Sequence, residues 1–377
     1  MIHSRQEDRQ EDRQEDRIDM KLSRFDYTLD PSLIATMPLA ERDRSRLLVY
    51  HRRDKAIEHR SFRDILDYLD PADLLVFNDT RVFPARLRGR KKTGGKIEIL
   101  CLRSIASKEE DRESRVYSCE VLLKGHCKVP LDIVLMGDIT ARLTRDLEDG
   151  RKELKISLPR ESYADVFEYM EKWGEVPLPP YIVKRRRPDS RLREFDRVRY
   201  QTVYAKRWGS AAAPTAGLHF TKPLVEAIEA KGVRTAATTL HIGIDTFRPI
   251  RTASVLDHKM HEEWYAVSPH AAEAVNGARR RGGKVFSVGT TVTRALESAS
   301  QVDGTLKAAE GKTDLFITPG YIFRGIDALI TNFHQPKSTL MVLVTAFVGE
   351  KAVESIYCEA MQRRYRFYSY GDAMLIL

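Results

Sequence analysis

The pattern of apolar and polar positions divides the chain into three kinds of sequence. Residues 1–19 contain the tetrapeptide QEDR three times, at 6–17, and no apolar stripe, which predicts a disordered or solvated extension. Residues 20–71 and 166–377 alternate short apolar runs with amphipathic stretches, for example LLVY at 47–50 and then FRDILDYL at 62–69. Short apolar runs predict buried strands, and apolar positions at helical spacing predict helices packed against them. Both segments therefore predict an α/β domain.

Residues 72–165 follow a different pattern. Short segments that alternate with period two are separated by glycine and charged turns: KIEILCL, RVYSCEVLL, DIVLMG, TARLTR and KELKISL. Several such segments in succession predict a small antiparallel barrel or sandwich. Because α/β sequence lies on both sides, we expect residues 72–165 to form a domain inserted into the α/β domain.

Composition and charge narrow the class of protein. The formal net charge of +9 at pH 7 favours an anionic partner such as RNA without requiring one. Four cysteines form no CxxC pair, which indicates a reducing compartment rather than a disulfide framework or a zinc site. No apolar run reaches the roughly 18 residues that span a bilayer, and no secretory signal is evident. We therefore expect a cytoplasmic protein without a membrane segment.

The stretch from Tyr200 to Thr221, YQTVYAKRWGSAAAPTAGLHFT, is the first candidate for a ligand-binding loop. Its small side chains let a ligand approach the main-chain N–H groups, and Gly217 can adopt a positive φ without steric cost. His219 lies in the same run. The alternative is a tight turn between a strand and a helix that holds a satisfied histidine. We expect the ligand to contact the turn itself: Pro214, Thr215, Ala216, Gly217 and Leu218.

A second candidate loop follows a predicted strand near residue 288. Gly289, Thr290 and Thr291 lead from that strand into a helix, where backbone N–H groups favour an anion or a ribose. Arg294 and Glu297 follow one helical turn later. The alternative is an ordinary strand–turn–helix unit.

Two further strands also end in polar residues. His241 follows a buried strand, and Asn332 and His334 follow the strand DALIT. Open α/β sheets bind their ligands at such carboxyl ends. Asp372 lies in an aromatic loop that precedes the last predicted strand.

Two basic stretches are candidates for phosphate contacts. The first is DLLVFNDTRVFPARLRGRK at 73–91. Its arginines that stand two residues apart would share one face of a strand. The alternative is a solvated edge strand that resists aggregation. The second is KRRRPDSRLREFDRVR at 184–199, either a solvated loop or a loop that contacts RNA. We expect phosphate contacts from Arg81, Arg86, Arg88, Arg185 and Arg186.

Two patterns that suggest other ligands are rejected. GTLKAAEGKT at 304–313 has six residues between its glycines, whereas a P-loop has four. His258 and His261 have a spacing that metal ligands use, but no third ligand is spaced to complete the site. We expect no metal.

Several of these motifs are long, ordered and specific. AAAPTAGLHF, LHIGIDTF, GTTVTRALES, TNFHQPKSTL and YSYGDAMLI stand at predicted strand ends, and FDYTLDPSLIA, SRLLV and LVFNDTRVFPARL precede them. On these motifs the chain resembles the S-adenosylmethionine:tRNA ribosyltransferase-isomerase family of queuosine biosynthesis, from about Met20 to Leu377. It departs from the family's common residues at Thr36, Asp245 and Gln335, where Gln, Gly and Leu are usual.

The resemblance implies a three-layer αβα sandwich with an inserted β-barrel. It also implies that the ribosyl part of S-adenosylmethionine is transferred to a 7-aminomethyl-7-deazaguanine base at the tRNA wobble position and isomerised. The products are epoxyqueuosine-tRNA, adenine and methionine. S-adenosylmethionine is then a co-substrate, no other cofactor and no metal is expected, and the enzyme is expected to be a monomer.

Such a reaction needs a general base, a proton donor for adenine and a carboxylate near the amine. His219, His241 and His334 are the candidate acids and bases, because histidine titrates near neutral pH. Which of them takes which role stays open, and His219 is our preferred base. The candidate carboxylates are Glu297, Asp327 and Asp372.

Two other hypotheses belong to different classes of protein. An S-adenosylmethionine-dependent methyltransferase is disfavoured by the missing glycine-rich loop after a first strand. A non-catalytic RNA-binding protein would account for the charge and for residues 184–199, but it leaves the histidine-bearing loops unexplained. Release of adenine separates these hypotheses, since methyl transfer yields S-adenosylhomocysteine and a binding protein yields neither product.

Overall fold

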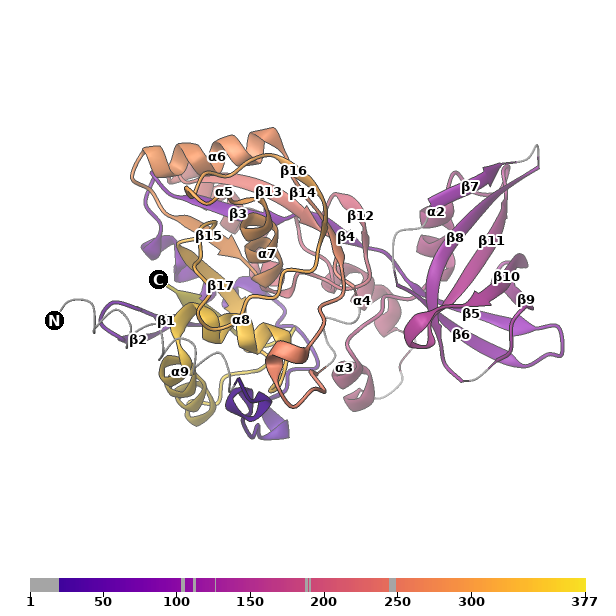
Figure 1. Ribbon diagram of the computed structural model, residues 1–377, viewed down its shortest axis with the longest axis horizontal. Coiled ribbons are helices and arrows are strands. Elements are labelled where there is room, and N and C mark those ends of the chain that lie inside the picture. The colour runs from indigo at the N-terminus through magenta and orange to yellow at the C-terminus, as the bar shows by residue number, and fades with distance from the viewer. Residues whose placement is uncertain are drawn as a thin grey trace, which may run out of the picture.

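The computed structural model describes residues 20–102, 106–110, 113–125, 127–186, 189, 191–243 and 249–377. The QEDR repeat, and with it the predicted extension, lies outside the described residues. Figure 1 shows a body built on a large twisted sheet and a smaller β-barrel at its right-hand side.

A nine-stranded sheet organises the body. Its strand order is β16 (Ala309–Thr313), β14 (Glu263–Val267), β13 (Arg234–Leu240), β3 (Leu74–Asn78), β15 (Val285–Val288), β17 (Ala328–Asn332), β18 (Ala373–Ile376), β1 (Arg46–Tyr50) and β2 (Ile57–Ser61). β13, β3, β15 and β17 are parallel neighbours. Every residue of β3, β15 and β17 is buried, and a strand covered on both faces needs a continuous apolar run rather than alternation.

Helices cover both faces of this sheet. Leu74 and Val76 of β3 face a core shared with α6 (Pro269–Arg280), α7 (Thr290–Ala299), α8 (Thr339–Val348) and α9 (Glu350–Gln362). Leu75 and Phe77 face the opposite core, shared with α5 (Lys222–Ala230) and the 3-10 helix Phe62–Tyr68. The expected three-layer αβα sandwich is confirmed.

The second part is a closed antiparallel barrel. Its six strands are β5 (Arg86–Lys91), β6 (Lys96–Cys101), β8 (Ser114–Leu123), β9 (Leu131–Leu135), β10 (Ile139–Asp146) and β11 (Lys152–Pro159). The pairing of β11 with β8 closes the barrel, and β7 (Ala106–Glu110) pairs with β8 as a further strand. From Lys152 to Leu158 buried and half-buried residues alternate, as period two requires. The expected inserted barrel is confirmed.

The strand β3 corrects the expected extent of the barrel. Leu74–Asn78 falls within the range 72–165, yet it is a central strand of the large sheet and not a barrel strand. Its continuous apolar run already distinguishes it from the alternating segments that follow. The division of the chain into domains at residues 72 and 165 stays a proposal.

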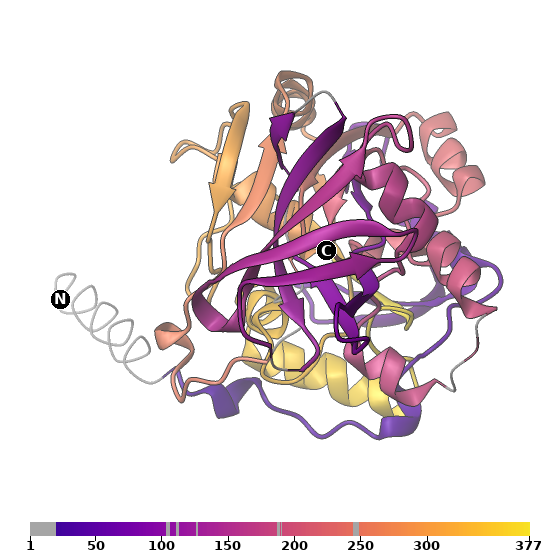
Figure 2. The same cartoon turned by 90° about the vertical axis from the view of Figure 1, so that its right-hand side faces the viewer.

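A short two-stranded ribbon lies between the body and the barrel (Figure 1). It pairs β4 (Thr80–Val82) with β12 (Arg207–Ser210) in parallel. The return from the barrel to β12 passes through three short helices: α2 (Val166–Trp173), α3 (Pro180–Arg185) and α4 (Leu192–Arg199). The expectation of a loop over 184–199 is wrong for its second half, which is α4. Seen from the barrel side, the barrel strands lie in front of the body (Figure 2).

No helix in the described part of the chain is long and apolar enough to cross a membrane.

Candidate active site

The parallel strands bring several predicted loops to one edge of the sheet. The chain passes from β3 to its neighbour β13, and then to β15 on the other side of β3. The strand order therefore reverses beside β3, and crevices form at such a point outside the carboxyl ends of the strands. A small hollow of about 30 Å³ lies there. Among the predicted ligand-contacting residues, it is lined by Pro214, Thr215, Ala216, Gly289, Thr290, Thr291, Asn332 and His334.

Helix α7 begins at this hollow. Gly289 precedes it with φ 96°, a conformation that favours glycine, and its N–H donates to the carbonyl of Ile330 in β17. The hydroxyl of Thr291 accepts a hydrogen bond from Asn78 Nδ2 at 3.1 Å. Unpaired N–H groups and the helix dipole make such a terminus attractive to an anion. The predicted anion-favouring turn therefore lies in the hollow.

His219 lies behind the hollow rather than in its lining. Asn332 Oδ1 accepts from the hydroxyl of Thr215 at 2.8 Å, so its Nδ2 donates to Nε2 of His219 at 3.0 Å. Nδ1 of His219 then donates to the hydroxyl of Ser45 at 2.7 Å. The ring also stacks on Phe62, with 4.9 Å between centroids. Both ring nitrogens are thus engaged, and His219 fixes the side chain of Asn332.

His219 is neutral at physiological pH. Burial, together with the guanidinium groups of Arg366 and Arg42, lowers its pKa to about 3. Burial disfavours the imidazolium form because a charged ring would have to leave water.

His334 is the predicted histidine that lines the hollow. Its Nε2 lies 2.8 Å from the hydroxyl of Thr331, and its backbone N–H donates to the hydroxyl of Tyr357 at 2.9 Å. Nδ1 has no hydrogen-bond partner within the described residues. Burial lowers the pKa of His334 to about 3, so the ring is neutral at physiological pH.

His241 follows β13 at the same edge of the sheet. The hydroxyl of Thr80 donates to Ser210 at 3.0 Å, so Thr80 accepts from Nδ1 of His241 at 2.8 Å. Nε2 therefore carries the lone pair, and no described residue donates to it. The ring stacks on Trp264 with 4.8 Å between centroids. Burial, and then the charge of Arg207, lowers its pKa to about 4.

Sequence reasoning missed the polar residues that position this histidine. Asn78 accepts the N–H groups of Thr80 and Leu240 and donates to the carbonyl of Leu240. Ser210 accepts from the N–H of Ile242 at 2.7 Å. Asn78 and Thr80 belong to the motif LVFNDTRVFPARL, and neither was predicted as a site residue. The available signal was an asparagine directly after a fully apolar strand at a ligand-binding edge.

The predicted carboxylates serve other parts of the fold. Glu297 accepts from the N–H groups of Arg324 and Gly325 and from the hydroxyl of Tyr321. Burial raises the pKa of Glu297. Asp372 accepts from the N–H groups of Arg46 and Arg366, at 3.1 and 2.8 Å. Neither side chain lines the hollow.

Asp327 and Arg294 also contact the protein rather than the hollow. Asp327 precedes β17 and accepts from the N–H of Val285, at the amino edge of the sheet, opposite the hollow. Arg294 forms a buried ion pair with Glu263 and donates to the carbonyl of Leu315. Glu263 in turn accepts from the N–H of Gly243 at 2.9 Å. This ion pair therefore fixes the backbone of the segment that follows β13.

Two residues of the PTAGL turn pack inward. Gly217 does not have the positive φ expected of it. Its requirement for glycine has another cause, since a Cβ there would lie 2.1 Å from the hydroxyl oxygen of Tyr204. Leu218 belongs to a small core with Tyr200 and Tyr370 and does not line the hollow. Asp245, where the chain departs from the family pattern, lies outside the described residues.

The predicted phosphate-contacting arginines pair within the protein. Three of them lie near carboxylates: Arg81 with Glu171, Arg86 with Glu98, and Arg88 with Glu175. The side chain of Arg88 stays 61% exposed.

The two arginines from the second basic stretch differ from each other. Arg186 forms a largely buried ion pair with Asp196 at 2.6 Å and donates to the carbonyl of Thr36. It is therefore unavailable for a phosphate without breaking this pair. Arg185 donates to the carbonyl of Pro31 from an exposed position.

Among the described residues, no three histidine, cysteine, aspartate or glutamate side chains gather closely enough to hold a metal ion.

A hollow at the switch point of a parallel sheet is where α/β enzymes bind their ligands, and here His334 lines it. The chain belongs to the queuosine biosynthesis protein family, whose sequence model matches residues 22–376.

Named relatives extend over almost the whole chain. The S-adenosylmethionine:tRNA ribosyltransferase-isomerase of Symbiobacterium thermophilum is 47% identical over 363 residues, covering 95% of this chain and 100% of the relative. The protein of the same name from Geobacter sulfurreducens is 47% identical over 357 residues, with the same two coverages. The crystal structure of S-adenosylmethionine tRNA ribosyltransferase from Thermotoga maritima superposes with a TM-score of 0.52 at 37% identity, covering 94% of this chain and 100% of that one.

Proposed function

We propose that this protein is an S-adenosylmethionine:tRNA ribosyltransferase-isomerase. It transfers the ribosyl part of S-adenosylmethionine to 7-aminomethyl-7-deazaguanine at the tRNA wobble position and isomerises it, which yields epoxyqueuosine-tRNA, adenine and methionine. The observation that carries this proposal is the family match over residues 22–376, together with a relative of that name that is 47% identical over 95% of this chain.

S-adenosylmethionine binds in the hollow at the switch point. N–H groups at the amino terminus of α7 donate to an anionic or ribose oxygen of this ligand, because Gly289, Thr290 and Thr291 line the hollow. A cavity of about 30 Å³ holds about one water molecule, whereas ligand pockets have about 300–1,000 Å³. Binding therefore widens the hollow between α7 and the PTAGL turn.

The general base is His334 or His241. Each is neutral near pH 7, and each has a ring nitrogen that no described residue occupies. A neutral imidazole can remove a proton from the carbon next to a sulfonium, since that carbon is acidified by the positive sulfur. His219 is a positioning residue, because it acts through Asn332 on Thr215.

The remaining assignments follow from this function. The partner is tRNA carrying the aminomethyl-deazaguanine base, with Arg81, Arg86, Arg88 and Arg185 near its backbone. S-adenosylmethionine is a co-substrate, and neither a metal nor another cofactor takes part. The enzyme is a cytoplasmic monomer.

A mass-spectrometric assay tests the reaction. Protein, S-adenosylmethionine and tRNA carrying the modified base are incubated, and adenine, methionine and the tRNA mass are measured. The proposal requires adenine release with a matching mass gain on the tRNA. S-adenosylhomocysteine would instead identify a methyltransferase, and folded protein that releases neither product would favour an RNA-binding protein.

A further inference from the structure

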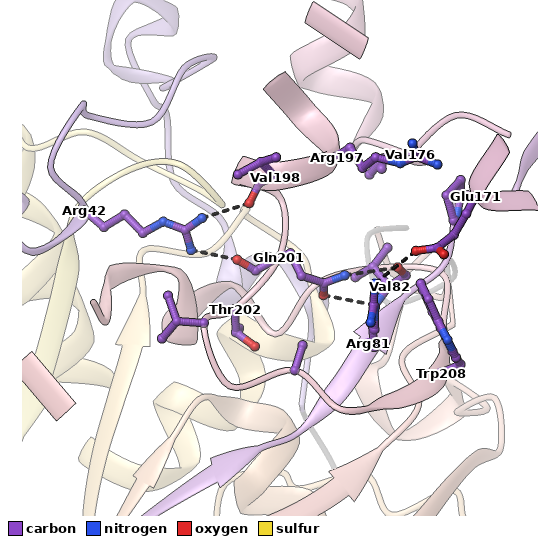
Figure 3. A pocket seen from close by; sticks show the side chains of 13 residues that line it. Arg42, Arg81, Val82, Glu171, Val176, Arg197, Val198, Gln201, Thr202 and Trp208 are labelled. Atoms are coloured by element: carbon purple, nitrogen blue, oxygen red, sulfur yellow. Dashed lines mark hydrogen bonds and ion pairs between the residues drawn. The ribbon is translucent and has the colours of Figure 1, made fainter. Parts of the chain in front are cut away.

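A second cavity, of about 290 Å³, lies where the barrel meets the body (Figure 3). Its walls come from the ribbon strands β4 and β12, helices α2 and α4, the 3-10 helix Arg42–Arg44, and the segment between α4 and β12. None of the residues predicted to bind S-adenosylmethionine lines it. With close to 300 Å³, it approaches the size of pockets that hold small organic ligands.

The cavity carries an excess of positive charge. Three arginines and one glutamate line it: Arg42, Arg81, Arg197 and Glu171. Arg42 is held by the carbonyls of Gln201 and Val198, at 2.6 and 2.9 Å. Glu171 pairs with Arg81 at 3.0 Å, which leaves two arginines without a carboxylate among the lining residues. The site therefore suits an anionic ligand.

One wall of the cavity is flat and aromatic. The guanidinium carbon of Arg81 lies 3.9 Å from the ring centroid of Trp208. The indole of Trp208 stacks on Phe167, with 5° between the planes. Stacked guanidinium and aromatic planes are the surfaces on which proteins hold unstacked nucleobases.

Two polar groups of the lining have unsatisfied hydrogen-bonding capacity. Thr202 is 5% exposed, and its buried hydroxyl has no hydrogen-bond partner within the described residues. Nη2 of Arg197 is also buried without a described partner, while its Nη1 lies 3.6 Å from Glu194. A buried polar group left without a partner destabilises the folded protein unless a ligand supplies the missing bond.

The cavity adjoins the proposed S-adenosylmethionine site through one short turn. A Cβ on Gly217 would lie 2.9 Å from Cγ2 of Thr202. Gly217 belongs to the 3-10 helix Thr215–His219, and Thr215 lines the hollow. The two sites are therefore close enough for one RNA strand to contact both.

We propose that this cavity binds the nucleotide next to the modified base in the tRNA. The neighbouring base lies against the Arg81 and Trp208 pair, its phosphate faces Arg197, and Thr202 donates to a base or sugar oxygen. This inference rests on the proposed function, because it takes the tRNA as the substrate.

The test uses the full protein and an RNA stem-loop that carries the modified base in its loop. Dissociation constants are measured by fluorescence titration for this stem-loop and for two versions with an abasic nucleotide on either side of the modified base. The proteins are wild type, Thr202→Val, Arg197→Gln and, as a control, Arg191→Gln. Arg191 lies at the start of α4, has an 89% exposed side chain and does not line the cavity.

One abasic stem-loop should bind wild type and Arg191→Gln about tenfold more weakly than the intact one, which is the scale of a lost base stack. Thr202→Val and Arg197→Gln should bind the intact stem-loop more weakly than wild type does. For these two variants, the dissociation constants of the abasic and the intact stem-loop should differ by less than twofold. Thr202→Val should also melt at a higher temperature than wild type, since it removes the unpartnered hydroxyl and keeps the side-chain shape. Weaker RNA binding by a more stable protein excludes misfolding as the cause.

An abasic effect of equal size in all four proteins would overturn the proposal, because the cavity would then not contact that nucleotide. Adenine release by wild type is measured in parallel. If wild type releases no adenine but retains the cavity-dependent abasic effect, the proposed reaction fails and the nucleotide site stands. If wild type releases adenine but shows no cavity-dependent abasic effect, the proposed reaction stands and the nucleotide site fails.

Discussion

Replacing His219 by phenylalanine separates a positioning role from a role as the base. Phenylalanine keeps the ring volume and the stack on Phe62, but it removes both ring nitrogens. In this buried site the hydroxyl of Ser45 then loses its partner, and Asn332 Nδ2 keeps only a long contact of 3.5 Å to the carbonyl of Asp372. Each orphaned group destabilises by about 1–3 kcal/mol. At pH 7 we expect the free energy of unfolding to fall by about 2–6 kcal/mol.

The difference in the free energy of unfolding between wild type and His219→Phe must shrink as the pH falls. The pKa of His219 falls from 6.5 to about 3 on folding, so its stabilising contribution is complete above pH 6.5 and is lost as the pH falls toward 3. Wild type therefore loses about 1.36 kcal/mol per pH unit in this window through His219, and the variant does not. Between pH 6.5 and 5 the gap narrows by about 2 kcal/mol.

Urea unfolding at pH 7, 6 and 5 measures this gap. The exposed His270→Gln variant is the matched control for the loss of a histidine ring outside the core. A gap for His219→Phe that stays constant from pH 6.5 to 5 would refute the assignment of His219 as a buried neutral ring. In the adenine-release assay, His219→Phe should lower kcat without changing the shape of its pH profile. Loss of the acidic limb would instead identify His219 as the base.

Three other substitutions test the site and its support. His334→Gln should lower kcat about 10²-fold in the adenine-release assay and leave the KM for S-adenosylmethionine unchanged, because it removes a ring nitrogen that faces the hollow. Gly209→Ala should lower kcat about 10- to 100-fold, since its Cβ would lie 2.5 Å from Nε2 of His241 and displace that ring. Glu263→Gln should lower the free energy of unfolding in urea by about 3–5 kcal/mol, because Arg294 would keep a buried charge without its partner.

Matched substitutions control two of these results. Gly311→Ala adds a Cβ with no atom within 4 Å, so it should leave kcat unchanged. Glu262→Gln removes the carboxylate of an exposed pair with Lys312 and should change stability by less than about 1 kcal/mol. Wild-type kcat in His334→Gln would exclude His334 as the base, and full activity in Gly209→Ala would show that His241 need not keep its place. A loss below about 1 kcal/mol in Glu263→Gln would contradict a role for the buried pair in stability.

Loops at strand ends could be predicted from the sequence because two local signals coincide there. An apolar run marks a buried strand, and polar or small residues directly after it mark the edge where ligands bind. Gly289 and Asn332 follow this rule and do line the hollow. The three-layer arrangement followed from the family resemblance that the motifs on these loops carry, and not from the local pattern.

The roles of ionisable side chains could not be predicted in this way. Glu297 and Asp372 accept hydrogen bonds from backbone N–H groups that other segments supply, and no local pattern encodes those partners. Arg186 reads as a solvated cation in a basic run, yet it is paired and buried against Asp196. Side chains with long-range partners are therefore the ones for which sequence patterns fail.

The position of β18 has a consequence for biosynthesis. Ala373–Ile376 pairs with β17 on one side and with β1 on the other. β1 is synthesised more than 320 residues earlier, which at about 5–20 residues per second means roughly 16 to 65 seconds before its partner exists. Until then the sheet consists of two separate pieces with unpaired apolar edges. The nascent protein must therefore stay soluble with an open sheet, and chaperone binding is expected to protect Leu47–Val49 while the ribosome is still translating.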